Sequence, residues 1–255
     1  MIIIKTPKEI ETLREGGRRL ATILHKVKER VAPGVSTKDL DAYAEELIRA
    51  GGDTPAFLNY RPEGASMPFP GSLCVSVNDE VVHGIPSAER VLEEGDIVSI
   101  DLGLRHQGLY TDMALTVPVG KVSPASLKLM EVTERALMVG ISAAYGGNKV
   151  GDIGHAIEGF VKPHRYGIVE VLSGHGVGRA IHEDPYIPNF SKAGKGAKLV
   201  PGMVIALEPM LNNGTKNVTL DDDGYTFRTA DGKKSAHFEH TILITDGEPE
   251  ILTKV

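Results

Sequence analysis

Four acidic residues lie in segments that are otherwise apolar. They are Asp101 in IVSIDLGL, Asp112 in TDMALTV, Glu208 in VIALEPM and Glu239 in FEHTILI. Because alternate residues of a strand face opposite sides, each acid lies on the less apolar face of a strand built for burial. Ionised carboxylates in such places are costly unless positive charge meets them, and these strand cores contain no lysine or arginine. The pattern indicates either carboxylates that converge on metal ions or four separate acids at strand edges facing water.

Three histidines have surroundings that fit the same site. His175 and His182 lie seven residues apart in SGHGVGRAIHEDP, and His83 follows the LCVSV segment in VNDEVVHGIP. Glycines beside His175 allow close backbone approach, and imidazole mixed with carboxylates suits zinc, cobalt, iron or manganese better than calcium or magnesium. The spacing does not match the HExxH motif of zincins. Taken singly, a histidine is more often structural than catalytic, and we assign the structural role to His25, His106, His155, His164 and His240.

Pairs of helices are predicted to precede strands in both halves of the chain. A capping box at Thr6-Pro7-Lys8-Glu9 predicts a helix that stops at Pro33-Gly34, and Ser36-Thr37 begins a second helix that stops at Gly51-Gly52. Strands follow at LCVSV, at IVSIDLGL and over residues 109–119. Further helices begin at Ser123-Pro124 and at about Gly151, and strands return to the end of the chain.

The order of elements repeats, and so do short motifs. A glycine precedes Asp39 and Asp152 by five residues at a helix start, and a glycine precedes Asp101 and Glu208 by six residues at a strand. Each half then has one more acidic strand. Chance recurrence explains one such pair, whereas several pairs in the same order favour internal duplication. We therefore predict a single α+β domain over residues 1–255, with duplicated halves of about 1–122 and 123–255.

Composition limits the classes of function. The formal net charge of −6, from 28 basic and 34 acidic residues, argues against nucleic-acid specificity. One cysteine, Cys74, excludes an internal disulfide and fits a reducing compartment. No stretch is long and apolar enough for a signal peptide or a membrane span, so we expect a cytoplasmic protein with no membrane association.

Taken together, five motifs in order resemble one family. VNDEVVHGIP, the pair of aspartates eleven residues apart, GHGVGRAIHEDP, ALEPM and FEHTI resemble the methionine aminopeptidases of the pita-bread fold, and the resemblance runs nearly end to end. It implies an antiparallel sheet covered by two pairs of helices. The short second half and the lack of an N-terminal zinc-binding extension are similar to the short bacterial type I form.

The resemblance also implies a reaction and its residues. Asp101, Asp112, His175, Glu208 and Glu239 would hold two divalent ions (cobalt, manganese, iron or zinc), with Asp112 and Glu239 bridging them. A hydroxide bridging the ions would attack the first peptide bond of nascent proteins whose second residue is small. Glu208 would also carry the proton, His182 would stabilise the tetrahedral intermediate, and His83 would contact the substrate amide.

Other implied features concern specificity and partners. Cys74, Phe69, Tyr60 and Tyr225 would form the methionine pocket, with Ile181 and Tyr225 replacing larger aromatic residues of some relatives. Asn78 and Ser235 would flank a monovalent cation. A monomer acting on nascent chains, in association with the ribosome, is the expected state. Two alternatives remain: an Xaa-Pro aminopeptidase or dipeptidase, and a non-catalytic pita-bread binding protein.

Overall fold

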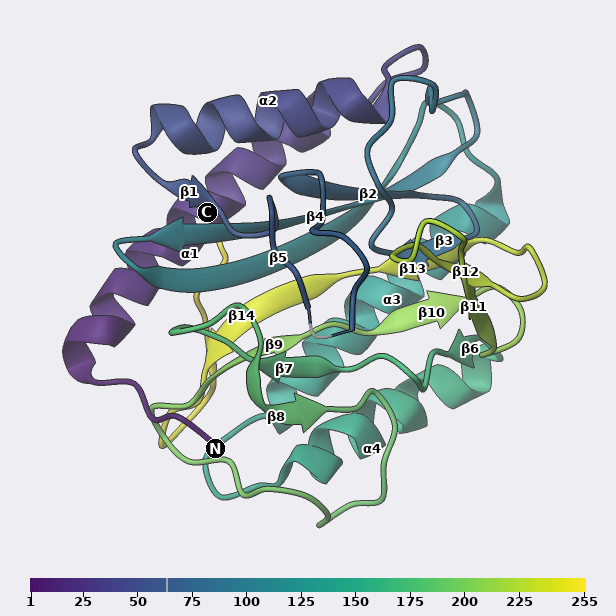
Figure 1. The fold of residues 1–255 in the computed structure, drawn as a ribbon. Coiled ribbons are helices and arrows are strands. Elements are labelled where there is room, and N and C mark those ends of the chain that lie inside the picture. The colour runs from purple at the N-terminus through teal and green to yellow at the C-terminus, as the bar shows by residue number, and fades with distance from the viewer. Residues whose placement is uncertain (63) are drawn as a thin grey trace.

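A computed structural model describes residues 1–62 and 64–255, and its elements follow the predicted order (Figure 1). The helices are α1 (Pro7–Glu29), α2 (Thr37–Ala50), α3 (Pro124–Ala143), α4 (Val150–Val161) and the short η1 (Lys162–His164). The strands are β1 (Thr54–Pro55), β2 (Leu73–Val77), β3 (Glu80–Val82), β4 (Ile97–His106), β5 (Leu109–Pro118), β6 (Gly167–Ile168), β7 (Gly174–Gly176), β8 (Glu183–Ile187), β9 (Val204–Leu207), β10 (Met210–Asn212), β11 (Val218–Leu220), β12 (Phe227–Thr229), β13 (Ser235–His237), β14 (Glu239–Leu243) and β15 (Glu250–Ile251).

The helix starts read from the sequence are confirmed. The Thr6 hydroxyl accepts a hydrogen bond from the Glu9 N–H, and the Glu9 carboxylate accepts one from the Thr6 N–H, so the capping box forms as predicted. α3 begins directly after its predicted cap, Ser123. Helix α1 ends before Pro33-Gly34, and α4 begins one residue before the predicted Gly151. Local capping chemistry therefore sets these boundaries.

The central sheet has nine strands and joins the two halves of the chain. Its order is β1-β4-β5-β14-β9-β7-β8, with β2 also paired to β4 and β15 to β14, and each of its described pairs is antiparallel. Two three-stranded sheets, β13-β10-β6 and β11-β12-β3, flank it. Strand β14, from the end of the chain, lies between β5 and β9. The acid-bearing strands from both halves are therefore neighbours.

Two pairs of helices, α1 with α2 and α3 with α4, cover one face of the sheet (Figure 1). Val98, Ile100 and Leu102 of β4 pack in one core with the buried side of α1 and α2. Ile205 and Ile242, of β9 and β14, pack in a second core with α3 and α4. Because strand residues alternate between faces, burying these positions under the helices leaves the acids on the other face. The predicted pita-bread arrangement is confirmed.

The N-terminal segment crosses to the second half and is held there by a buried ion pair. The Lys5 ammonium donates a hydrogen bond to Glu183 at 2.5 Å, and the side chains are only 1% and 4% exposed. The other Glu183 oxygen accepts from the N–H groups of Arg179 and Ala180. A Cβ at Gly178 would collide with the Lys5 side chain, so glycine at this position leaves room for Lys5 to reach Glu183. The segment thereby braces the loop that carries His182.

Lys5→Met is therefore expected to destabilise the protein strongly. Removing the cation leaves the Glu183 carboxylate buried without its partner, a loss of about 3–5 kcal/mol in the free energy of unfolding. Thermal and urea denaturation would measure it. Lys8→Met provides the control, because Lys8 is exposed and its loss should change stability by less than about 0.5 kcal/mol. Equal stability of the two variants would contradict the role of the pair.

Among the described residues, the helices are too short or too polar to cross a membrane.

Candidate active site

Strand register brings three of the acids onto one patch of the sheet. Asp101 of β4 and Glu239 of β14 are both paired with Ala114 of β5, one from each side. Asp112 lies two residues before Ala114 and so faces the same way. Neighbouring strands are about 4.8 Å apart, so the three carboxylates must lie close together. The small Ala114 side chain leaves room between Asp101 and Glu239.

Strand register also places two residues from the second half of the chain, His175 and Glu208, beside these three acids. His175 of β7 and Thr241 of β14 are both paired with Ala206 of β9. Glu208 lies two residues after Ala206 on the same face. The prediction that Glu208 lies within a strand was wrong by one residue, because β9 ends at Leu207. Glu208 Oε1 lies 3.6 Å from His175 Nε2, and Asp112 Oδ2 lies 4.0 Å from the same atom. The five predicted ligands are thus brought together.

This cluster fits a divalent metal centre. Ligand atoms of Asp112, His175 and Glu239 lie within 4.8 Å of one another. Asp101 Oδ1 and Glu239 Oε1 are buried without a hydrogen-bond partner among the described residues. None of the described residues that line the surrounding pocket is a lysine or arginine. Buried carboxylates without a cationic side chain need another positive charge, and metal ions supply it.

Burial changes the proton affinity of every member of the cluster. Desolvation, followed by repulsion from neighbouring carboxylates, raises the pKa of Asp101 and Glu239 well above the usual range. The same causes raise the pKa of Asp112, and desolvation raises that of Glu208. Without metal ions, the cluster therefore retains protons that exposed carboxylic acids would lose.

His175 is prepared for metal binding by its neighbours. Its Nδ1 lies 2.8 Å from the carbonyl oxygen of Gly176, which fixes the proton on Nδ1 and leaves the Nε2 lone pair facing the carboxylates. Desolvation lowers the pKa of His175 to about 3, so the ring is neutral. A Cβ at Gly174 would collide with the Ala206 carbonyl, and one at Gly176 with the Asp184 carbonyl. The flanking glycines therefore permit the close strand contacts, as their clustering predicted.

His182 lies beside the cluster on the loop that Lys5 braces. Its ring centroid is 4.5 Å from that of His175, edge to face. Its Nδ1 lies 2.9 Å from the Tyr60 hydroxyl, so Tyr60 orients the ring. Desolvation lowers the pKa of His182 as well. The remaining nitrogen, Nε2, stays available to a ligand in the pocket.

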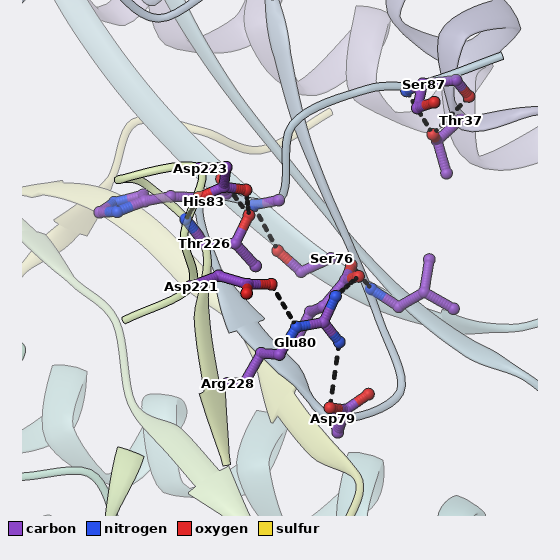
Figure 2. A network of polar contacts seen from close by, with 12 residues as sticks. Thr37, Ser76, Asp79, Glu80, His83, Ser87, Asp221, Asp223, Thr226 and Arg228 are labelled. Atoms are coloured by element: carbon purple, nitrogen blue, oxygen red, sulfur yellow. Dashed lines mark hydrogen bonds and ion pairs between the residues drawn. The ribbon is translucent and has the colours of Figure 1, made fainter. Parts of the chain in front are cut away.

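His83 reaches the pocket from the end of β3, in a left-handed backbone conformation with φ of 59°. Its carbonyl accepts a hydrogen bond of 3.4 Å from the Thr226 hydroxyl, and the next N–H, of Gly84, donates to Ser76 Oγ. Arg228 of β12 binds Asp79, Glu80 and Asp221 and ties β3 to its neighbours (Figure 2). The unusual backbone at His83 is thereby held from two sides.

Apolar side chains form the other wall of the pocket, which encloses about 150 Å³. The predicted members Tyr60, Phe69, Cys74 and Tyr225 line it together with the three histidines and four acids, and Phe57 and Pro62 join them. Ile181 packs in the same apolar cluster without lining the pocket. The Phe69 and Tyr225 rings meet edge to face at 5.3 Å, and Tyr225 hydrogen-bonds to the Met67 carbonyl. The loop over residues 60–70 therefore contributes to the wall through its described part, which excludes residue 63.

One buried histidine near the acids was missed from the sequence. His237 Nε2 lies 3.6 Å from Glu208 Oε2 and 3.9 Å from Glu239 Oε2. The alternation of strand residues could have predicted this position, because residue 237 faces the same way as Glu239 whereas His240 faces the other way. The structure places His240 outside the pocket, with Nδ1 2.9 Å from the Thr253 hydroxyl. The Ser235 N–H donates to the Asn78 carbonyl at 2.7 Å, so these two predicted residues are also adjacent.

Comparison with known proteins agrees with this geometry. Residues 11–246 match the sequence model of metallopeptidase family M24. Methionine aminopeptidase 1 of Bacillus subtilis is 47% identical over 255 residues and covers 100% of both chains. The crystal structure of methionine aminopeptidase from Thermotoga maritima is 42% identical, with a TM-score of 0.95 and full coverage of both chains. The prolidase from Pyrococcus furiosus is 26% identical, with a TM-score of 0.77, and this chain covers 66% of it.

The chain therefore belongs to metallopeptidase family M24. Within that family, its full-length similarity lies with methionine aminopeptidases rather than with the larger prolidases. It is a metal-dependent aminopeptidase, and the buried Asp112, His175 and Glu239 group fits metal binding. The alternative of a proline-directed peptidase is not favoured, and the non-catalytic alternative does not fit a chain that brings all five predicted ligands together.

Proposed function

We propose that this protein removes the N-terminal methionine from proteins and peptides whose second residue is small. The observation that carries the proposal is the pocket itself, in which an apolar wall faces the carboxylate–histidine cluster. Cys74 on β2 is paired with Asp101 on β4, so the wall and the cluster meet across one strand pair. A flexible thioether side chain suits an apolar pocket of this size, and none of the described wall residues carries a charged side chain.

In this proposal five residues hold two divalent ions. Asp101, Asp112, Glu208 and Glu239 would hold them through carboxylate oxygens, and His175 would hold them through Nε2. When bound, the ions supply positive charge that stabilises a developing oxyanion, lower the pKa of water, and accept the substrate's free amine. A ligand set of carboxylates and one imidazole accepts cobalt, manganese, iron or zinc, so availability would decide the metal. Asn78 and Ser235 are proposed to hold a monovalent cation nearby.

The chain's own side chains then perform the remaining steps. Glu208 lies at the open side of the cluster, 13% exposed, where its carboxylate can take a proton from water and pass it to the leaving amine. His182 lines the pocket, and its Nε2, the nitrogen that Tyr60 does not contact, is proposed to donate to the tetrahedral oxyanion. His83, neutral because desolvation lowers its pKa to about 4, is proposed to contact the amide that follows the cleaved bond.

Several wider properties are also proposals. Asp152 accepts from the Lys149 N–H at the start of α4 as Asp39 accepts from the Ser36 N–H at the start of α2, which supports one catalytic domain with duplicated halves. The relatives' names support action on protein N-termini. We further propose a cytoplasmic monomer that meets nascent chains at the ribosome.

Three tripeptides test the specificity. With Co²⁺, Mn²⁺ or Fe²⁺ added, the protein should release methionine from Met-Ala-Ser, leave Met-Leu-Ser largely intact and ignore Ala-Pro-Ala. Chromatography of the released amino acid provides the readout, and EDTA-treated protein gives the blank. Cleavage of Ala-Pro-Ala alone would replace the proposal with a proline-directed peptidase. Silence on all three peptides would favour a binding protein.

A further inference from the structure

His237 is a buried histidine whose ring nitrogens have no hydrogen-bond partner among the described residues. It ends β13 and is paired with Met210 of β10, and its side chain is 2% exposed. Neither Nδ1 nor Nε2 makes a hydrogen bond. An unpaired buried polar group costs about 1–3 kcal/mol, so a histidine at this place needs a compensating role.

The geometry around Glu208 indicates that role. One Glu208 oxygen lies 3.6 Å from His175 Nε2, and the other lies 3.6 Å from His237 Nε2. The carboxylate is therefore bracketed by two imidazoles. They differ in which nitrogen is available, because the Nδ1–H of His175 donates a hydrogen bond to the Gly176 carbonyl, whereas neither ring nitrogen of His237 has a partner among the described residues. His237 Nε2 is thus free to carry the hydrogen and donate it.

We propose that His237 is a positioning residue, whose Nε2–H donates a hydrogen bond to Glu208 Oε2 when the centre is loaded. The separation of 3.6 Å exceeds a hydrogen bond by a few tenths of an ångström, which a small side-chain rotation closes. The bond holds Oε1 toward His175 and the metal side and fixes the plane of the carboxylate. Hydrogen bonds to metal-binding carboxylates orient them in this way and raise metal affinity. The inference rests on the proposed role of Glu208.

Variants of His237 separate donation from packing. His237→Phe fills the same space without a donor, and His237→Gln keeps an N–H of similar reach. His240→Gln is the matched control, because His240 is also a largely buried histidine but lies outside the pocket. If His237→Phe fails to fold, the flexible and donor-free His237→Met replaces it. Thermal denaturation of metal-free protein shows which variants are folded.

Two measurements then test the hydrogen bond. Calorimetric titration of metal-free protein with Mn²⁺ should show affinity lowered about 10–100-fold in His237→Phe, with kcat for Met-Ala-Ser lowered by a similar factor and KM little changed. His237→Gln should recover most of both losses. Wild-type affinity and kcat in His237→Phe would overturn the proposal, and equal losses in His237→Phe and His237→Gln would overturn the donor role.

The titration also separates this inference from the proposed function. If the wild type binds Mn²⁺ but releases no methionine, the proposed substrate is wrong. The Mn²⁺ affinities of the His237 variants would still decide whether His237 positions Glu208.

Discussion

Glu208→Gln is expected to lower kcat for Met-Ala-Ser by about 10²–10⁴-fold at saturating Mn²⁺. The amide retains the shape of the carboxylate and one oxygen for a metal, but it cannot take a proton at neutral pH. Among the four carboxylates of the cluster, Glu208 has the most exposed side chain, at 13%, so we expect it to be the one that reaches both water and the leaving amine. Steady-state kinetics at several Mn²⁺ concentrations would separate lost proton transfer from weakened metal binding.

Two controls make this result specific. Glu170→Gln changes an exposed glutamate that binds Lys216 outside the pocket, and it should leave kcat unchanged. Metal-free Glu208→Gln should unfold at or above the wild-type temperature at pH 8, because the substitution removes a buried group whose ionisation is opposed by desolvation. Wild-type turnover in Glu208→Gln at saturating metal would exclude Glu208 as the proton carrier.

Much of this site could be predicted because its information is local. Capping boxes such as Thr6 to Glu9 fix where helices begin, and the period of two along strands fixes which face each acid occupies. The convergence of Asp101 and Glu239 could be inferred only indirectly, from the cost of burying acids without cations. The structure supplies the cause, which is that both residues are paired with Ala114 in a sheet whose middle strand comes from the end of the chain.

Other features depend on packing between distant segments, which no local pattern encodes. The ion pair between Lys5 and Glu183 joins residues 178 positions apart and is buried on both sides. Lysine in an N-terminal segment ordinarily lies in solvent, so sequence alone gives no reason to bury it. His237 was missed for a different reason. It faces the same way as Glu239, but Phe238 separates β13 from β14, so His237 belongs to a different strand from the acid and its place beside Glu208 depends on the packing of two sheets.

Removing the metal ions is expected to abolish activity and to make stability fall as pH rises from 7 to 8. In metal-free protein the folded-state pKa values of the four carboxylic acids are raised by desolvation and mutual repulsion. Acids of this kind make their full contribution to the free energy of unfolding below their pKa in the unfolded state, which is about 4. They lose this contribution as the pH rises through their pKa in the folded state. Each proton retained only by the folded state gives a slope of about −1.4 kcal/mol per pH unit.

The buried histidines act in a different range of pH. His83, His175 and His237 have pKa values lowered to about 4, 3 and 3 by desolvation, so they cost stability only below about pH 6.5, where the unfolded chain takes up protons. Between pH 7 and 8 the carboxylic acids therefore decide the slope. Bound metal replaces their protons, so excess Mn²⁺ should flatten the slope, release protons on binding and add about 4 kcal/mol at a concentration of 1,000 Kd.

Thermal and urea denaturation at pH 7.0, 7.5 and 8.0, with EDTA or with Mn²⁺, would measure these slopes. Asp101→Asn combined with Glu239→Gln removes two of the strained acids and should flatten the slope without metal, because neither amide gains a charge on unfolding. Glu170→Gln changes an exposed acid and should leave the slope as it is. A metal-free wild type whose stability rises between pH 7 and 8 would mean that the four carboxylates are already ionised in the folded protein. A cationic partner would then have to neutralise them, and the case for a metal centre built on uncompensated acids would fail.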